Sequence, residues 1–116
     1  MHSNVVVSKS LEFAVRIVNL YRYLVSKRHE TVMSKQVLRS GTSIGANTRE
    51  ANSAQSKADF LAKLAIALKE CDETGYWLEL LLRTSYITKK QQQSLEKDRR
   101  EVFALLTAII KSAKAK

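Results

Sequence analysis

Four stretches of the chain repeat their apolar residues at the spacing of an amphipathic helix. We expect helices over about residues 8–27, 33–51, 57–84 and 88–113. The third stretch has the clearest repeat, with intervals of three and four between Leu61, Leu64, Leu68, Cys71, Gly75, Leu78 and Leu82. Such heptad spacing gives shallow, left-handed helix crossings. The pattern predicts an all-α protein: an antiparallel up-down-up-down four-helix bundle, in one domain over residues 1–116.

The first helix carries more apolar surface than a bundle core needs. Its polar residues form one stripe, and at about 100° per residue the apolar ones cover roughly half of the circumference. The apolar residues are Leu11, Phe13, Ala14, Ile17, Val18, Leu20, Tyr21, Leu24 and Val25. A bundle helix usually buries a narrower band. We therefore expect a second buried contact here, at a subunit interface.

The second helix has a thin seam of small residues, namely Val37, Gly41, Ile44, Thr48 and Ala51. Each of its two glycines, Gly41 and Gly45, costs about 1 kcal/mol in a helix interior relative to alanine. Because the two glycines lower helix stability, we expect them to serve a purpose that alanine could not. Two interpretations stand: close approach of a neighbouring helix, or a ligand-binding groove.

Two helix starts and one arginine carry local expectations. Thr88 with Gln91 forms a predicted capping box, and Ser56 with Asp59 caps the third helix in a similar way. Arg99 falls on the inward seam of the fourth helix, where it either extends to the end of the bundle or pairs with an acidic residue; we favour the first.

Composition narrows the class of protein. The absence of proline and the presence of only three glycines disfavour a β-sandwich or barrel, which needs frequent turns. A single cysteine, Cys71, excludes a disulfide framework and a thiolate metal site, and its place on the third seam predicts a small buried residue. No export signal or membrane-spanning run is visible, so we expect a cytoplasmic protein without a membrane role.

The chain is strongly basic, with 20 Lys and Arg against 11 Asp and Glu, a net charge of +9. Such an excess favours polyanionic partners, nucleic acid first. Five cations share one side of the fourth helix and are called the basic stripe below: Lys90, Lys97, Arg100, Lys111 and Lys114. Arg16 and Arg22 add charge on the first helix. A solvated surface without a ligand is the alternative. No base-reading motif accompanies the stripe, so we expect contacts with phosphates.

A second group of residues carries a family resemblance. Residues 36–51 read QVLRSGTSIGANTREA and resemble a signature of the form Q-x-x-R-S-x-x-S-I-x-x-N-I-A-E-G. Downstream, residues 57–60 (KADF) and 66–78 (IALKECDETGYWL) resemble a second block. The chain thus resembles the four-helix bundle protein family, also called the 23S rRNA intervening-sequence protein family, over about residues 11–110.

The resemblance implies an antiparallel four-helix bundle that assembles into a ring, typically a homopentamer. A relative, the accessory protein of diversity-generating retroelements, forms a basic pentameric barrel that binds a reverse transcriptase and nucleic acid. By this resemblance the partners are a second copy of the chain, RNA, and a reverse transcriptase-like protein.

The family's polar positions correspond to Arg39, Ser43, Asn47, Glu50 and Glu73. They could form a polar ligand site, but no nucleophile–base pair accompanies them, so we expect structural hydrogen bonding. Glu73 lies three residues after a second glutamate, as in di-metal bundles, yet the histidine of that motif is missing. We therefore expect no catalytic residue, no metal and no cofactor.

The sequence as a whole predicts a ring-forming, non-enzymatic adaptor that binds nucleic acid, RNA first, through phosphate contacts. The alternative is a scaffold that binds an acidic protein or a reverse transcriptase-like protein and has no direct contact with nucleic acid.

Overall fold

Helices account for almost all of residues 4–116, the part of the chain that the computed structural model describes. They are α1 (Asn4–Ser26), α2 (Met33–Asn52), α3 (Lys57–Arg83) and α4 (Lys89–Lys114), and no strand occurs within this range. The all-α prediction is confirmed. Residues 1–3 of the expected domain lie outside the described residues. Helix α1 starts at Asn4 rather than at the expected Ser8, because Val6 continues the buried face with 3% of its surface exposed.

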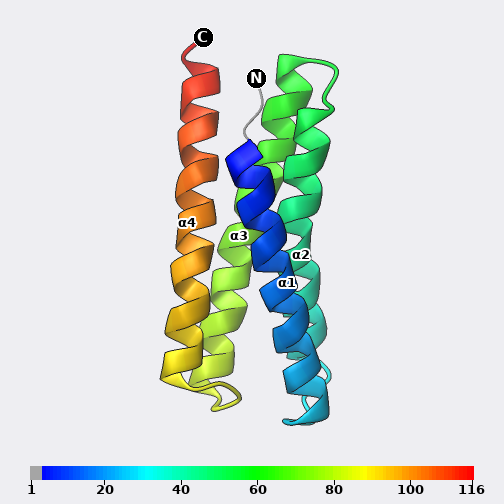
Figure 1. The fold of residues 1–116 in the computed structure, drawn as a ribbon, viewed down its shortest axis with the longest axis vertical. Helices are drawn as coiled ribbons and strands as arrows, with labels where there is room; N and C mark the ends of the chain where they lie inside the picture. Colours follow the sequence, from blue (N-terminus) through cyan, green and yellow to red (C-terminus); the bar gives the residue numbers. More distant parts are fainter. Residues whose placement is uncertain (1–3) are drawn as a thin grey trace.

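Successive helices run in opposite directions along an elongated bundle (Figure 1). Contacts between the helices fix the directions: Ser10 of α1 is hydrogen-bonded to Thr48 of α2, and Ile17 of α1 lies against Gly41 of α2. Between α2 and α3, Glu50 meets Lys63 at one end and Arg39 meets Glu70 further along. In both helix pairs the residue numbers rise in one helix as they fall in the other, as antiparallel packing requires.

The thin seam of α2 lies fully inside the bundle, as predicted. Its five residues are all buried. A Cβ atom added to Gly41 would come within 2.7 Å of Ile17 Cγ1, so the glycine lets α1 approach α2 closely. The buried hydroxyl of Ser40 accepts a hydrogen bond from Thr74 at 2.9 Å, which joins α2 to α3. Close helix packing is thus what the small residues of α2 provide.

The core face of α3 is rotated from the predicted seam. The buried residues are Leu64, Ala67, Cys71, Thr74, Leu78 and Leu81. The predicted seam members Leu61, Leu68 and Leu82 are only half-buried. The reason is that α3 packs on α2 as well as on α4, so its deepest positions lie between the two contacts. Cys71 is fully buried, as predicted, and burial raises the pKa of its thiol to about 11.

The favoured expectation for Arg99, extension to the end of the bundle, is wrong, and the alternative of pairing with an acidic residue is found instead. Its guanidinium stays at the α3–α4 contact, where it pairs with Glu96 and donates to the Cys71 carbonyl oxygen at 3.2 Å. The hydrogen bond with Glu96 raises the pKa of Arg99 above its usual value. Gly75 makes the space, since a Cβ atom there would lie 2.7 Å from Arg99 Cζ. An acid one turn earlier on the same helix therefore holds the arginine inside.

The helix starts are capped by side chains. Thr88 and Gln91 form the complete predicted capping box, and the Ser56 hydroxyl accepts from the Asp59 amide. At α2 the carboxylate of Glu30 accepts from the amides of Val32, Met33 and Ser34, a cap that the sequence pattern does not predict. Each of these three helices thus has at least one of its first amides bonded to a side chain.

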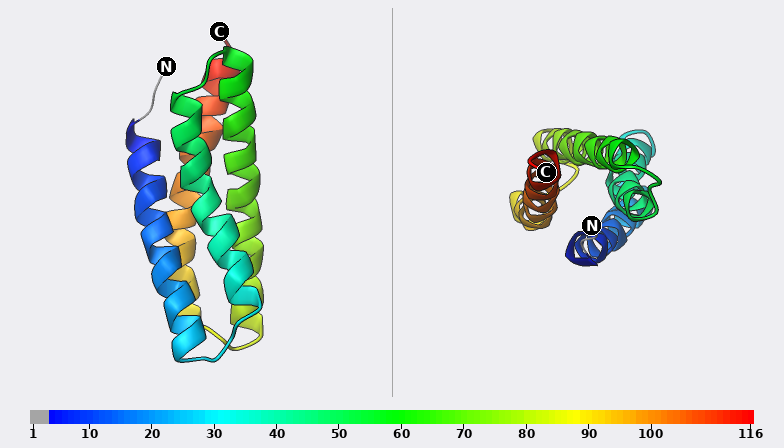
Figure 2. Two further views of the ribbon diagram at one scale, coloured as in Figure 1. Left: turned by 90° about the vertical axis from the view of Figure 1, so that its right-hand side faces the viewer. Right: turned by 90° about the horizontal axis from the view of Figure 1, so that it is seen from above.

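The bundle is least closely packed between α1 and α4. Viewed along its axis, the helices follow a horseshoe from α1 through α2 and α3 to α4 (Figure 2). The hollows between the two end helices are lined by side chains of both. No helix within the described part of the chain is long and apolar enough to cross a membrane.

Candidate nucleic-acid interface

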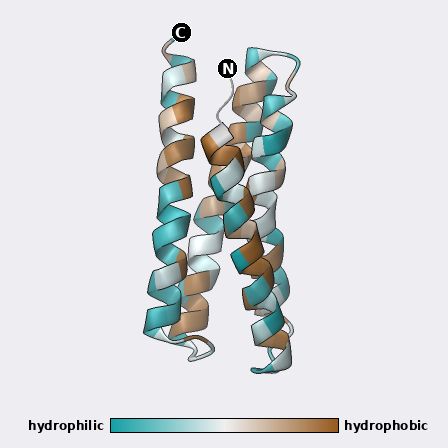
Figure 3. Ribbon diagram, in the orientation of Figure 1, coloured by the Kyte–Doolittle hydropathy of each residue, from teal (hydrophilic) through white to brown (hydrophobic). Residues whose placement is uncertain are grey.

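The basic stripe lies on the outer side of α4. All five of its cations are exposed: Lys90, Lys97, Arg100, Lys111 and Lys114. The first half of α4 is almost wholly hydrophilic (Figure 3). A shallow hollow of about 500 Å³ lies at Lys97 and Arg100, with Gln92, Gln93 and Glu96 as its other lining residues. The stripe is therefore accessible along the length of the helix.

The carboxylates of α4 are all ion-paired with cations that do not belong to the stripe. Asp98 pairs with Arg16 of α1 at 2.7 Å, and Glu101 pairs with Lys9 of α1 at 3.6 Å. Glu96 turns to Arg99 at the α3 contact. By contrast, no stripe cation has an ion-pair partner among residues 4–116. The outer side of α4 thus carries positive charge that nothing nearby neutralises.

The two arginines predicted on α1 occupy different places. Arg16 donates to the Ser94 carbonyl oxygen at 3.0 Å and to its hydroxyl at 2.9 Å, in addition to its pair with Asp98, so it fastens α1 to α4. It shares a hollow of about 430 Å³ with Lys90 of the stripe. Arg22 is exposed, about 120° around α1 from Arg16. The structure therefore brings Arg16, and not Arg22, beside the basic stripe.

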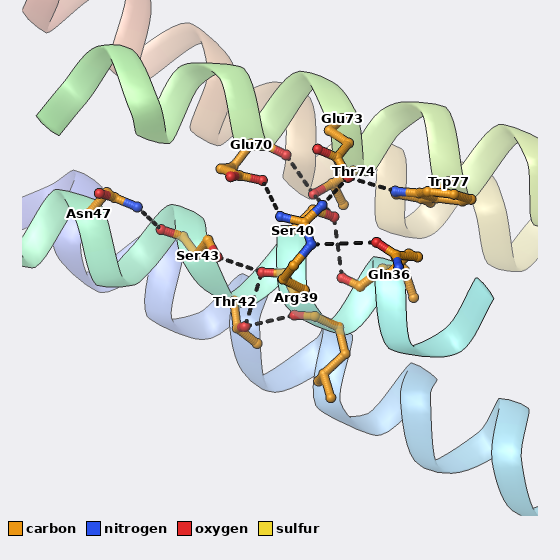
Figure 4. Close-up of polar contacts among 12 residues, drawn as sticks. Gln36, Arg39, Ser40, Thr42, Ser43, Asn47, Glu70, Glu73, Thr74 and Trp77 are labelled. Atoms are coloured by element: carbon orange, nitrogen blue, oxygen red, sulfur yellow. Dashed lines mark hydrogen bonds and ion pairs between the residues drawn. The ribbon is translucent and has the colours of Figure 1, made fainter. Parts of the chain in front are cut away.

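The family-motif residue Arg39 forms a second polar cluster, between α2 and α3 (Figure 4). Its guanidinium pairs with Glu70 at 3.1 Å and with Glu73. The same carboxylate oxygen of Glu73, Oε2, also accepts a hydrogen bond from the Trp77 indole at 2.9 Å. Two carboxylates neutralise one arginine here, so the cluster joins the helices and offers no free cation to a phosphate.

The other motif residues bond within the bundle. The Ser43 hydroxyl donates to the Arg39 carbonyl oxygen at 2.6 Å, and the Asn47 amide donates to the Ser43 carbonyl oxygen at 2.8 Å. Glu50 pairs with Lys63 of α3 at 3.4 Å. Each bond lies along α2 or toward α3, and the polar groups do not converge on a shared space. Within the described residues, no group of three or more His, Cys, Asp or Glu could hold a metal ion.

Comparison with known proteins places this bundle in a family. The family model described as 23S rRNA-intervening sequence protein matches residues 2–108. A solved structure of a protein with unknown function, from the S23 ribosomal protein family of Bacteroides thetaiotaomicron, superposes with a TM-score of 0.94. It is 66% identical, and the match covers 96% of this chain and 99% of that one. No curated protein matches the sequence. With a matching model over nearly its whole length, the chain belongs to the 23S rRNA-intervening sequence protein family.

Proposed function

We propose that the protein is a cytoplasmic, non-enzymatic adaptor that binds nucleic acid, RNA first, through the basic stripe of α4. The observation that carries this proposal is the division of charge on α4: its carboxylates are ion-paired to Arg16, Lys9 and Arg99, whereas the stripe cations are exposed and unpaired within residues 4–116. Unpaired cations on one rigid helix are suited to a row of phosphates.

The mechanism is electrostatic. Each phosphate that a stripe cation neutralises releases condensed counterions, so log affinity falls with log salt by about 0.7 per phosphate on a single strand and about 0.9 on duplex DNA. Self-association into a ring, which the family resemblance implies, would repeat the stripe in each copy and convert a weak contact into a multivalent one. The name of the family connects its members with 23S rRNA, which supports RNA as the first ligand to test.

Charge reversal on the stripe tests the proposal. Lys97→Glu combined with Arg100→Glu should abolish the gel shift of a structured RNA at low salt, because both side chains lie on the stripe and outside the core. Helicity and mass in solution should be unchanged.

A matched control makes the same change in net charge elsewhere. Lys35→Glu with Lys69→Glu reverses two exposed cations on α2 and α3 that have no ion pair within the described chain. This variant should retain most of the RNA binding. Unaltered binding by a folded stripe variant would contradict the proposal, as would equal losses in both variants.

A further inference from the structure

The hollow between α1 and α4 has an apolar floor and a polar rim. It has a volume of about 430 Å³ and lies where α4 begins. The floor consists of Leu20 and Leu95, which are 8% and 5% exposed, together with the half-buried ring of Tyr23. The polar rim consists of the exposed Asn19 and Lys90 and the half-buried Gln91, with Arg16 and Ser94 as the remaining lining residues. The volume falls within the range of about 300–1,000 Å³ that small-molecule sites occupy.

The rim has unused hydrogen-bonding capacity. Within residues 4–116 the Asn19 amide makes no hydrogen bond, and Lys90 makes no ion pair. Gln91 uses its amide oxygen to accept from the Thr88 backbone amide, which leaves its two N–H donors free. An apolar, aromatic floor lies beneath amide groups and two cations, Lys90 and the Asp98-paired Arg16. This lining suits a flat ligand with apolar faces, polar edges and an attached anion.

We propose that this hollow receives an unpaired base of an RNA strand whose phosphates follow the basic stripe. The proposal rests on the function proposed above and specifies it further, since it predicts a preference for single-stranded over duplex RNA. Tyr23 supplies the stacking surface, Asn19 and Gln91 contact the base edge, and Lys90 contacts the adjoining phosphate. Lys97 lies about 10 Å further along α4, within reach of the same strand. Stacking on an aromatic ring tolerates any base, which agrees with the lack of a base-reading motif.

Fluorescence of 2-aminopurine tests the contact directly. A single-stranded RNA oligonucleotide that carries this base should lose fluorescence on binding, because stacking on Tyr23 quenches it, whereas a duplex of the same length should not. Tyr23→Leu should weaken single-strand binding by about 5- to 150-fold, the range expected for one stacked base. It should leave duplex binding unchanged, and Tyr23→Phe should keep both affinities.

The control variant is Tyr76→Leu, which removes a ring that is 60% exposed on α3, outside the hollow. It should bind both RNAs as the original protein does. If the original protein binds the single-stranded RNA without a change in 2-aminopurine fluorescence, the hollow does not bind a base. This result would not contradict binding by the basic stripe, and it does not depend on whether Tyr23→Leu folds. Equal affinity of folded Tyr23→Leu for the single strand would overturn it too. Failure of the original protein to bind either RNA would instead overturn the proposed function, and the hollow with it.

Discussion

Gly41 and Gly45 lie about one turn apart on α2, yet they meet α1 differently. A Cβ atom at Gly41 would lie 2.7 Å from Ile17 Cγ1 and 2.8 Å from Cγ2, both on the β-branched base of that side chain. A Cβ atom at Gly45 would lie 3.4 Å from the Ser10 carbonyl oxygen, which is close to ordinary contact. Gly41 is therefore required by packing, whereas Gly45 has room for a methyl group.

Substitution should separate the two glycines. Gly41→Leu should lower the free energy of unfolding by about 1–3 kcal/mol, because overpacking against Ile17 outweighs the gain in helix propensity. Gly45→Ala should leave it unchanged or raise it by up to about 1 kcal/mol. Chemical denaturation of both variants measures the difference. A Gly41→Leu variant as stable as the original protein would show that α1 does not approach α2 in this way.

The inward position of Arg99 could be predicted from the sequence, but the space that its guanidinium occupies depends on residues of α3. Glu96 precedes it by three residues, which is a visible i,i+3 pair on one helix. The space for its guanidinium comes from Gly75 on α3, and the carbonyl group that it contacts belongs to Cys71. Both the space and the carbonyl contact depend on how α3 and α4 are aligned along each other. The apolar pattern of a single helix does not specify that alignment.

At the scale of elements, the start of α2 depends on one buried carboxylate. Glu30 is 7% exposed and accepts from three backbone amides, at 3.1, 3.0 and 2.7 Å. Burial alone would raise the pKa of Glu30, but the hydrogen bonds from Met33, Ser34 and Val32 outweigh it and lower the pKa below its ordinary value of 4.5. A carboxylate at a helix N-terminus also interacts favourably with the helix dipole.

The lowered pKa of Glu30 sets a pH window for its contribution to stability. Because the folded state holds the carboxylate ionised, the stabilisation is fully present above the unfolded pKa and is lost as pH falls through the folded one. Glu30→Gln should lower the free energy of unfolding at pH 7 by about 0.5–2 kcal/mol, as loss of a helix cap does. The difference from the original protein should shrink in acid. Denaturation curves at pH 7 and at acidic pH test this, with the exposed Glu12→Gln as control. A pH-independent difference would contradict it.

The sequence predicted the ends of the helices more accurately than it predicted which sides of the helices are buried. Caps and polar connections are local, so Thr88 and Ser56 marked the starts of α4 and α3 to within one residue. The buried side of α3 was harder to predict, because Thr74 is polar yet fully buried through its bond to Ser40. A hydroxyl is satisfied there only by a partner in another helix, which a hydropathy pattern does not show.

At the scale of the whole molecule, the basic stripe and the hollow differ in how they arise. The stripe depends on one helix, so the spacing of its lysines and arginines placed it correctly on an exposed side of α4. The hollow joins Tyr23 to Lys90, which are far apart in the sequence. The hollow exists only because α1 and α4 pack loosely against each other. This loose packing is a property of the assembled helices and does not follow from the sequence of either helix alone.

The outer side of α1 provides the argument for self-association. Leu11 and Val15 are four residues apart and 52% and 55% exposed, so they form an apolar strip that the bundle leaves uncovered. A hollow of about 400 Å³ beside Leu11, bordered by Ala14, Thr42 and Ala46, continues this strip toward α2. We expect another copy of the chain to cover it, since exposed apolar patches of this kind mark interaction surfaces.

The mass of the protein in solution tests this expectation. We predict an oligomer, and the family resemblance specifies a pentamer, five times the 13.1 kDa of one chain. Leu11→Asp with Val15→Asp should yield a folded monomer, because two charges would otherwise be buried without partners between subunits.

The control variant is Val32→Asp, which alters a residue that precedes α2 and is 73% exposed; it should leave the mass unchanged. A 13.1 kDa mass for the original protein at micromolar concentration would refute the oligomer. An intact oligomer in the double variant would instead place the interface on another surface. The multivalent action of the basic stripe would then be tested by measuring RNA affinity over a dilution series of the protein.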